Sequence, residues 1–144
     1  MKKAPGTKAV NKKASFNYEL KDEIEAGIVL TGAEIKAIRL GKVDLTGSHI
    51  RIISGEAFLL GGRITALNTD PSRTRKLLLH KAEITRMASK SDGKGLSLIP
   101  TKLYLTRGRA KVQLALGKGK KLHDKREALK KKDQIREEQR SEKF

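Results

Sequence analysis

Side chains that could carry catalysis are few and scattered in this sequence of 144 residues. His49, His80 and His123 lie far apart, and none has a carboxylate or a second histidine at the spacing of a metal-binding helix, so we interpret all three as surface residues. The acidic residues at 22–25 are interpreted as a solvated turn. Cysteine is absent, which excludes thiol catalysis, disulfides and zinc thiolate sites. We therefore predict that the protein is not an enzyme and has no metal site or cofactor.

Basic side chains, in contrast, gather in three segments: "NKKA" at 11–14, "SRTRKLLLHK" at 72–81 and "GKGKKLHDKR" at 117–126. The formal net charge is +17, from 33 Lys and Arg against 16 Asp and Glu. Such an excess is typical of proteins that bind nucleic acid, although an anionic membrane surface would also attract it. The membrane alternative is weaker because no run approaches the ~18 apolar residues of a spanning helix, and the basic segments lack an apolar face.

The second basic segment places Arg73, Arg75 and Lys76 directly before three leucines. This pattern has two interpretations that the residues alone leave open. One is a phosphate clamp whose backbone is anchored by the leucines, and the other is a charged loop that enters a buried segment.

The third basic segment alternates glycine with lysine. Glycine lets one backbone approach another closely, and Lys118, Lys120 and Lys121 can each neutralise a phosphate. A nucleotide-binding loop is excluded because the G-x-x-x-x-G-K-[ST] spacing is missing. Only five residues are aromatic. Because single-stranded RNA is usually held by several stacked aromatic rings, we expect the partner to be a folded RNA that is recognised by its phosphates and shape.

These segments must be positioned by a middle zone, residues 15–116, that holds nearly all the large apolar side chains. Residues 1–14 are predicted to form a basic, flexible arm. Residues 117–144 are predicted to form a basic tail that is disordered when free, because a helix there would lack an apolar stripe for docking on its own domain. This tail either gains helix on binding a polyanion or serves only as a solubilising extension.

Period-2 alternation predicts mainly strands within the middle zone. Strands are expected at 15–20 and 24–30, and hairpins at 49–53 with 56–64 and at 96–105 with 110–116. The apolar parity switches across Pro100, which predicts a bulge or an edge position. Helices are expected at 31–40, with Thr31 and Glu34 as a capping box, and at 80–89, and Asp70-Pro71 has the pattern of a helix start. We predict a mainly β fold with short helices, an OB-fold-like antiparallel β-barrel with flanking α-helices.

The segments "EAGIVLTGAEIKAIR", "DPSRTRKLLLHKAEI", "LIPTKLYL" and "GRAKVQLALGKGKKLHDKR" follow one another here as in the SsrA-binding protein family (SmpB), which this chain resembles over about residues 11–130. The resemblance implies an OB-fold-like adaptor that is not an enzyme. Such an adaptor binds the tRNA-like domain of transfer-messenger RNA (tmRNA). Together with elongation factor Tu it delivers that RNA to stalled ribosomes, and its tail occupies the decoding region and the empty mRNA channel.

The resemblance and the basic segments together nominate two sets of residues. The RNA-binding set comprises Asn11, Lys12, Lys13, Glu25, Arg73, Arg75, Lys76 and Leu78. The set expected at small-subunit rRNA comprises Lys118, Gly119, Lys120, Lys121, His123, Asp124, Lys125, Arg126 and Leu129. The protein is expected to be a cytoplasmic monomer. The alternative is a structural ribosomal protein whose basic arms bind rRNA.

Overall fold

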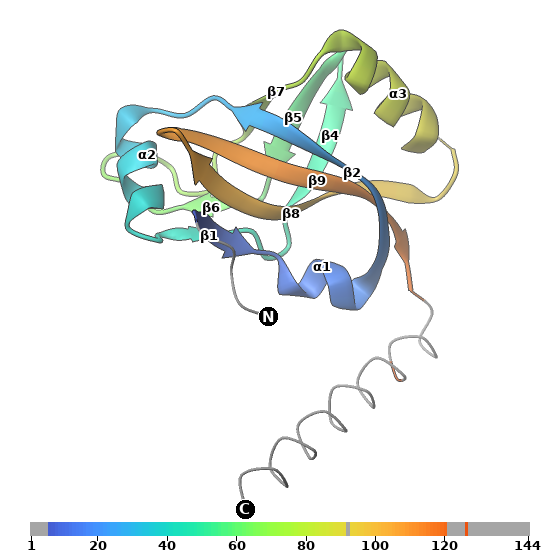
Figure 1. Ribbon diagram of the computed structural model, residues 1–144, viewed down its shortest axis with the longest axis horizontal. Helices are drawn as coiled ribbons and strands as arrows, with labels where there is room; N and C mark the ends of the chain where they lie inside the picture. The colour runs from blue at the N-terminus through green and yellow to red at the C-terminus, as the bar shows by residue number, and fades with distance from the viewer. Residues whose placement is uncertain (1–5, 92, 121–125, 127–144) are drawn as a thin grey trace, which may run out of the picture.

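A computed structural model describes residues 6–91, 93–120 and 126 of the chain, and the fold is mainly β with three short helices (Figure 1). The strands are β1 (Thr7–Val10), β2 (Tyr18–Ile28), β3 (Val43–Asp44), β4 (His49–Ile53), β5 (Glu56–Leu60), β6 (Arg63–Ile64), β7 (Arg75–Leu78), β8 (Leu96–Thr106) and β9 (Arg109–Gly119). The helices are α1 (Lys12–Asn17), α2 (Gly32–Arg39) and α3 (Lys81–Ser91).

Six of these strands form a closed antiparallel ring. The order is β8-β4-β5-β7-β2-β9, and the pairing of β8 with β9 closes it, while β1 pairs with β8 and β3 forms a separate pair with β6. Closure leaves few free strand edges, which protects a small β protein from edge-to-edge association. The predicted mainly β fold is confirmed, and both predicted hairpins are present as β4–β5 and β8–β9.

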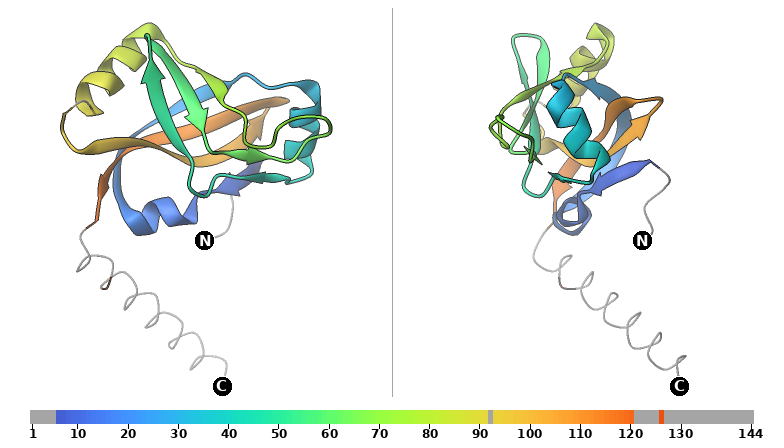
Figure 2. Two further views of the ribbon diagram at one scale, coloured as in Figure 1. Left: turned by 180° about the vertical axis from the view of Figure 1, so that it is seen from behind. Right: turned by 90° about the vertical axis from the view of Figure 1, so that its left-hand side faces the viewer.

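The core fills the ring with small and branched side chains. Leu103, Val112 and Leu114 are completely buried, and Ile38 of α2 joins them. Figures 1 and 2 show α2 at one end of the ring and α3 at the opposite end. From α3, Met87 packs into the same core. Two short helices therefore each contribute a buried side chain to the core at opposite ends of the ring.

The helix predicted at 31–40 begins as expected. The Thr31 hydroxyl accepts from the Glu34 backbone N–H (3.2 Å), and the Glu34 carboxylate accepts from the Thr31 backbone N–H (3.0 Å), which completes the capping box. The helix predicted at 80–89 is α3. Asp70-Pro71, however, starts no helix: the Asp70 carboxylate accepts from the Ser72 backbone N–H (3.0 Å), which stabilises a turn instead.

Two predicted boundaries are wrong. Residues 7–14 do not form a flexible arm, because β1 pairs with β8 and α1 begins at Lys12, and this helix also replaces the first half of the strand predicted at 15–20. Residues 117–119 do not belong to a tail, because β9 continues to Gly119 in register with β2. In both places backbone pairing with a distant strand overrides a local composition that is typical of disorder.

Two bulges interrupt the long strands. The pairing of β8 with β9 shifts between Pro100 and Lys102, so the predicted bulge is confirmed. The pairing of β2 with β9 shifts between Lys21 and Ile24, where Asp22 has a φ of 54°. The acidic residues at 22–25 therefore lie on a bulged strand and not in the predicted turn.

Candidate nucleic-acid interface

A groove of about 620 Å³ brings together three residues of the predicted RNA-binding set: Glu25 from β2 and Lys76 and Leu78 from β7. We call it the Glu25 groove. Strand alternation explains the two β7 residues, because Lys76 and Leu78 point away from the core while Arg75 and Leu77 point into it. Leu78 remains 55% exposed, opposite Gly27, which has no side chain to cover it. An exposed leucine beside charged groups is available for apolar contact with a partner.

The Glu25 groove carries charges of both signs. Its lining includes the cations Lys76, Lys81 and Lys111 and the carboxylates of Glu25, Glu56 and Glu83. Lys76 pairs with Glu56 (3.1 Å), and both side chains are about half exposed, so this ion pair exchanges readily with other partners. Mixed donors and acceptors of this kind can read hydrogen-bonding groups on RNA as well as neutralise phosphates.

Glu25 is oriented by Tyr104 of β8, whose hydroxyl donates a hydrogen bond to the Glu25 carboxylate. Burial raises the pKa of the Tyr104 phenol, and the hydrogen bond to Glu25 and its negative charge raise it further. The hydroxyl therefore stays protonated at neutral pH and keeps donating. One Glu25 oxygen accepts this hydrogen bond, and no hydrogen bond joins the other to a residue within the described part of the chain.

The neighbouring acids on the β2 bulge are engaged separately. Glu23 accepts from the Gln113 side-chain amide (2.6 Å), and Asp22 pairs with Lys90 (3.3 Å). These carboxylates therefore have different partners and do not form a convergent acid pair. Among the described residues, no group of three His, Cys, Asp or Glu side chains is arranged to hold a metal ion.

Arg75 is not a phosphate ligand, contrary to the clamp interpretation. Its side chain is fully buried and donates to the Glu34 carboxylate (2.7 Å), to the Gly62 carbonyl (2.9 Å) and to the Pro71 carbonyl (3.0 Å). Arg73 donates to the same carboxylate with its side chain 33% exposed. The two arginines therefore tie β7 and the preceding turn to the N-terminus of α2, and only Arg73 retains a solvent-facing portion.

Glu34 is the centre of this buried network. Burial alone would raise the pKa of its carboxyl, but the hydrogen bonds from Arg73, the Thr31 backbone and Arg75, together with the Arg75 charge, lower that pKa from 4.5 to about 2. The carboxylate is consequently ionised throughout the physiological range. One negative charge between two guanidinium groups compensates the burial of Arg75.

Asn11 is likewise engaged by the protein itself. It is 5% exposed, its side-chain amide donates to the Pro100 carbonyl (2.9 Å), and its side-chain oxygen accepts from the Ala14 backbone N–H (3.3 Å) as the N-cap of α1. These bonds make Asn11 a residue that positions α1 against β8. The adjacent Lys12 and Lys13 are exposed on this helix.

The residues predicted for the decoding region are described only in part. Lys118 and Gly119 are exposed at the end of β9, and the Lys120 ammonium donates to the Ser15 carbonyl of α1 (2.9 Å). Arg126 is exposed. Lys121, His123, Asp124, Lys125 and Leu129 lie outside the described residues, as does most of the predicted tail.

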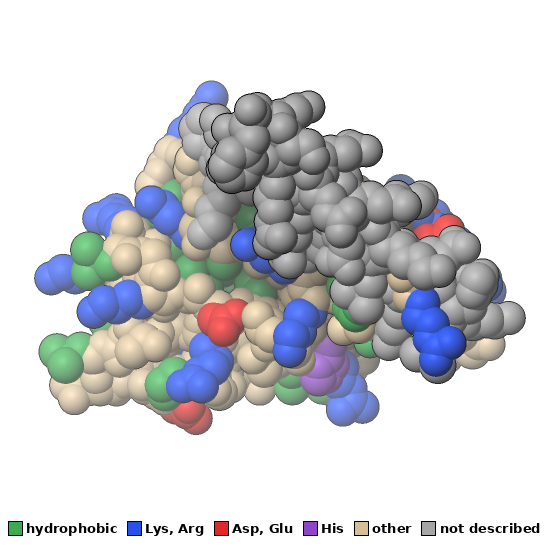
Figure 3. Space-filling model, turned by 90° about the horizontal axis from the view of Figure 1, so that it is seen from below, with side chains coloured by type: hydrophobic (Ala, Val, Ile, Leu, Met, Phe, Trp, Pro, Cys, Tyr) green, Lys and Arg blue, Asp and Glu red, His purple; other side chains and the backbone are tan. Residues whose placement is uncertain are grey.

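Basic side chains spread over the described part of the face seen in Figure 3, and acidic side chains are sparse there.

His49 and His80 are exposed, as expected for surface histidines. No helix within 6–91, 93–120 and 126 is long and apolar enough to cross a membrane.

Sequence reasoning missed two contacts that shape this interface. One is the hydrogen bond from Tyr104 to Glu25, and the other is the pairing of Glu34 with Arg73 and Arg75. Period-2 alternation was available to place Arg75 on the same inward face as Leu77, which would have predicted a buried arginine that needs a carboxylate. No comparable signal pointed to Tyr104, because Tyr104 and Glu25 are 79 positions apart in the sequence.

Comparisons with known proteins agree with the motif resemblance. The family model described as SmpB protein matches residues 8–144. The SsrA-binding protein of Nitratidesulfovibrio vulgaris (strain DP4) is 48% identical over 147 residues, covering 96% of each chain. That of Leptothrix cholodnii is 50% identical over 139 residues, covering 92% of this chain and 90% of the relative.

A solved structure described as "tmRNA-SmpB: a journey to the center of the bacterial ribosome" contains a similar chain. It is 45% identical, with a TM-score of 0.69, and the match covers 83% of this chain and 92% of that one. This protein therefore belongs to the SmpB protein family.

Proposed function

We propose that this protein binds tmRNA through the Glu25 groove and acts with it in trans-translation, the rescue of stalled ribosomes. The observation that supports this most strongly is the meeting of Glu25, Lys76 and Leu78 in one groove. These residues come from segments far apart in the sequence. The relatives are named for binding SsrA, and the similar solved chain is described with tmRNA and the bacterial ribosome.

The chemistry of the Glu25 groove suits a folded RNA. Lys76 and Lys111 supply phosphate neutralisation, and the exposed Leu78 can pack against a ribose or an unstacked base. The free oxygen of Glu25 can accept a hydrogen bond from a base amino group or a 2′-hydroxyl. Shape and hydrogen-bonding pattern, rather than charge alone, would then select the tRNA-like domain of tmRNA.

The finer proposal follows the family resemblance. The protein acts as a cytoplasmic monomer, and it delivers charged tmRNA to the ribosome together with elongation factor Tu. The segment after β9 contacts small-subunit rRNA in the decoding region. The exposure of Lys118 and Gly119 at the end of β9 supports this proposal.

A binding titration with Glu25→Gln tests the RNA-recognition part. The RNAs are a tRNA-like domain fragment and a generic hairpin of equal length, measured at two salt concentrations. Removing a negative charge should strengthen non-specific binding, since phosphates repel carboxylates. If Glu25 is a specific acceptor, the variant binds the tRNA-like fragment about tenfold more weakly and the hairpin no more weakly than the wild type.

Glu19→Gln is the matched control, because Glu19 is an exposed carboxylate on the same strand. It should leave the preference for the tRNA-like fragment unchanged. Equal strengthening toward both RNAs by Glu25→Gln and Glu19→Gln would contradict a specific role for the Glu25 groove.

Deletion of residues 121–144 tests the ribosomal part. The cut is placed after Lys120 because β9 and the Lys120 contact with Ser15 belong to the folded domain. The shortened protein should bind the tRNA-like fragment as the full chain does, but should fail to support peptide tagging on stalled ribosomes. Equal loss of RNA binding would show that this segment is simply part of the RNA site.

A further inference from the structure

Gly27 of β2 lies among the residues that line the Glu25 groove. It is in register with Leu78 of β7 on one side and with Lys111 of β9 on the other. Gly27 and Glu25 share the outward face of β2, because Ala26 between them is buried. A ligand that contacts both Leu78 and Lys111 therefore passes directly over Gly27.

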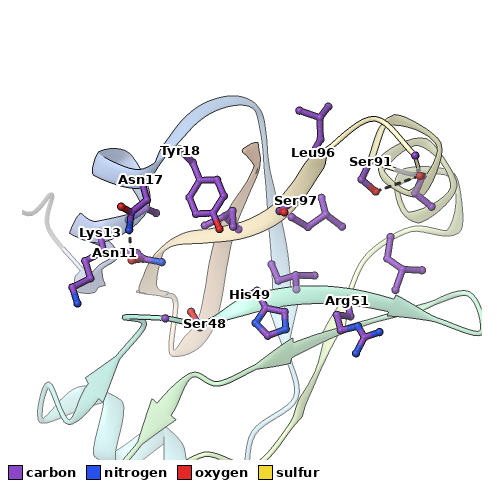
Figure 4. Close-up of a pocket in the computed structure, with 18 of the residues that line it drawn as sticks. Asn11, Lys13, Asn17, Tyr18, Ser48, His49, Arg51, Ser91, Leu96 and Ser97 are labelled. Carbon is purple, nitrogen blue, oxygen red and sulfur yellow. Dashed lines mark hydrogen bonds between the residues drawn. The ribbon is translucent and has the colours of Figure 1, made fainter. Parts of the chain in front are cut away.

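The backbone conformation of Gly27 does not require a glycine. Gly55 in the same groove has a φ of 77°, which favours glycine. Gly47 and Gly93, which line a larger groove of about 920 Å³ between β4 and β8 (Figure 4), have φ values of 76° and 65°. The φ of Gly27 lies outside this left-handed region. Because glycine inside a strand lowers stability relative to other residues, its presence at position 27 needs another reason.

Packing of the core does not require a glycine at position 27 either. An alanine Cβ there would lie 3.3 Å from the Leu78 Cβ and 3.4 Å from the Leu78 Cδ1. These contacts are tight, but Leu78 is 55% exposed at the end of β7, so it can move by a few tenths of an ångström. At Gly117, in contrast, a Cβ would lie 3.1 Å from side-chain atoms of Tyr18 and of buried Ile99. Gly117 is therefore a packing glycine, whereas the nearest neighbour of Gly27 is a surface side chain.

The missing side chain leaves the β2 backbone uncovered between Leu78 and Lys111. Glycine inside a strand often marks a site where a ligand approaches the backbone closely. Leu78 supplies apolar surface beside this site, Lys111 supplies a cation, and Glu25 supplies a hydrogen-bond acceptor. A flat, partly apolar group with a donor and an adjacent phosphate fits these three surfaces together, and a nucleotide has this composition.

We propose that Gly27 determines the specificity of the Glu25 groove, because a position without a side chain admits the base or ribose of a projecting nucleotide to the β2 backbone. The base or ribose lies against Leu78, and Lys111 neutralises an adjacent phosphate. This inference rests on the proposed function, since the RNA bound at the Glu25 groove is the ligand. A paired stem keeps its nucleotides stacked and gains nothing from the uncovered backbone.

Gly27→Ala tests the proposal by adding one methyl group at the uncovered site. The full-length variant should bind a tRNA-like domain fragment about tenfold more weakly than the wild type, because overfilling a close contact is costly. Its affinity for a generic hairpin of equal length should change less than about twofold, since charge contacts are retained. The midpoint of urea unfolding should not fall. An unchanged affinity for the tRNA-like fragment, or equal losses toward both RNAs, would overturn the proposal.

A double-mutant cycle with Leu78→Ala separates close approach of the RNA from a shift of the leucine. If the RNA touches the backbone at Gly27, the added methyl group weakens binding of the tRNA-like fragment by a similar factor with Leu78 and with Ala at position 78. If the methyl group acts only by displacing Leu78, Gly27→Ala has no effect in the Leu78→Ala background. That second result would overturn the proposed contact with the backbone.

Gly32→Ala is the matched control. Gly32 is exposed at the start of α2, does not line the Glu25 groove, and has a φ outside the left-handed region, and a Cβ there would meet no described atom within 4 Å. Both RNA affinities should stay unchanged in this variant. A wild type without preference for the tRNA-like fragment would overturn the proposed function and this inference together. A preference that Gly27→Ala retains would overturn the role of Gly27 alone.

Discussion

Replacing Glu34 with Gln should destabilise the fold by about 3 kcal/mol at pH 7. The substitution keeps the size of the side chain and an oxygen acceptor for the Thr31 cap, but removes the charge that faces Arg75 and Arg73. The pKa of Glu34 is lowered from 4.5 to about 2, and each unit corresponds to about 1.4 kcal/mol. Removing one member of a buried ion pair typically costs a similar amount, about 3–5 kcal/mol.

The lowered pKa of Glu34 also predicts how the stability difference between the wild type and Glu34→Gln changes with pH. Because the folded state lowers the pKa, the stabilisation from ionised Glu34 is fully present above about pH 4.5 and is lost as the pH falls toward 2. The stability difference between the wild type and Glu34→Gln should therefore be largest at neutral pH and shrink between pH 4.5 and 2. Urea unfolding followed by circular dichroism at several pH values measures it.

Glu56→Gln is the matched control for Glu34→Gln. Glu56 pairs with Lys76, but the two side chains are 51% and 46% exposed, so water screens the pair. Its loss should cost less than about 1 kcal/mol. A cost for Glu34→Gln below about 1 kcal/mol, or a difference that does not change with pH, would refute the view that one buried carboxylate holds α2 to β7.

Two further substitutions test how the interface is positioned. Tyr104→Phe removes the hydroxyl that orients Glu25 and should weaken binding of the tRNA-like fragment several-fold. The dependence of this affinity on salt concentration should not change. A changed salt dependence would mean that phosphate contacts were lost instead. Asn11→Ala removes the α1 cap and the partner of the Pro100 carbonyl, and should lower the free energy of unfolding by about 1–2 kcal/mol in urea titrations. Well below its Tm this variant should bind RNA nearly as the wild type does, and a large loss of affinity in the folded protein would restore Asn11 as a direct ligand.

The sequence alone determined the fold class and most of its elements. Period-2 alternation located the two hairpins, the Thr31–Glu34 spacing located α2, and the parity switch at Pro100 located the bulge, because each of these signals depends on neighbours in the chain. Motif resemblance gave the family and nominated Glu25 and Leu78, and the basic segment at 72–81 nominated Lys76.

Only the tertiary structure decided what individual charged residues do. Arg75 and Arg73 are two positions apart in a basic segment, yet the first is fully buried against Glu34 and the second is partly exposed. Asn11 and residues 117–119 have local composition typical of flexible ends, but distant strands supply their hydrogen-bond partners. Contacts such as Tyr104 with Glu25 depend on strand order and register around a closed ring, which local periodicity does not encode.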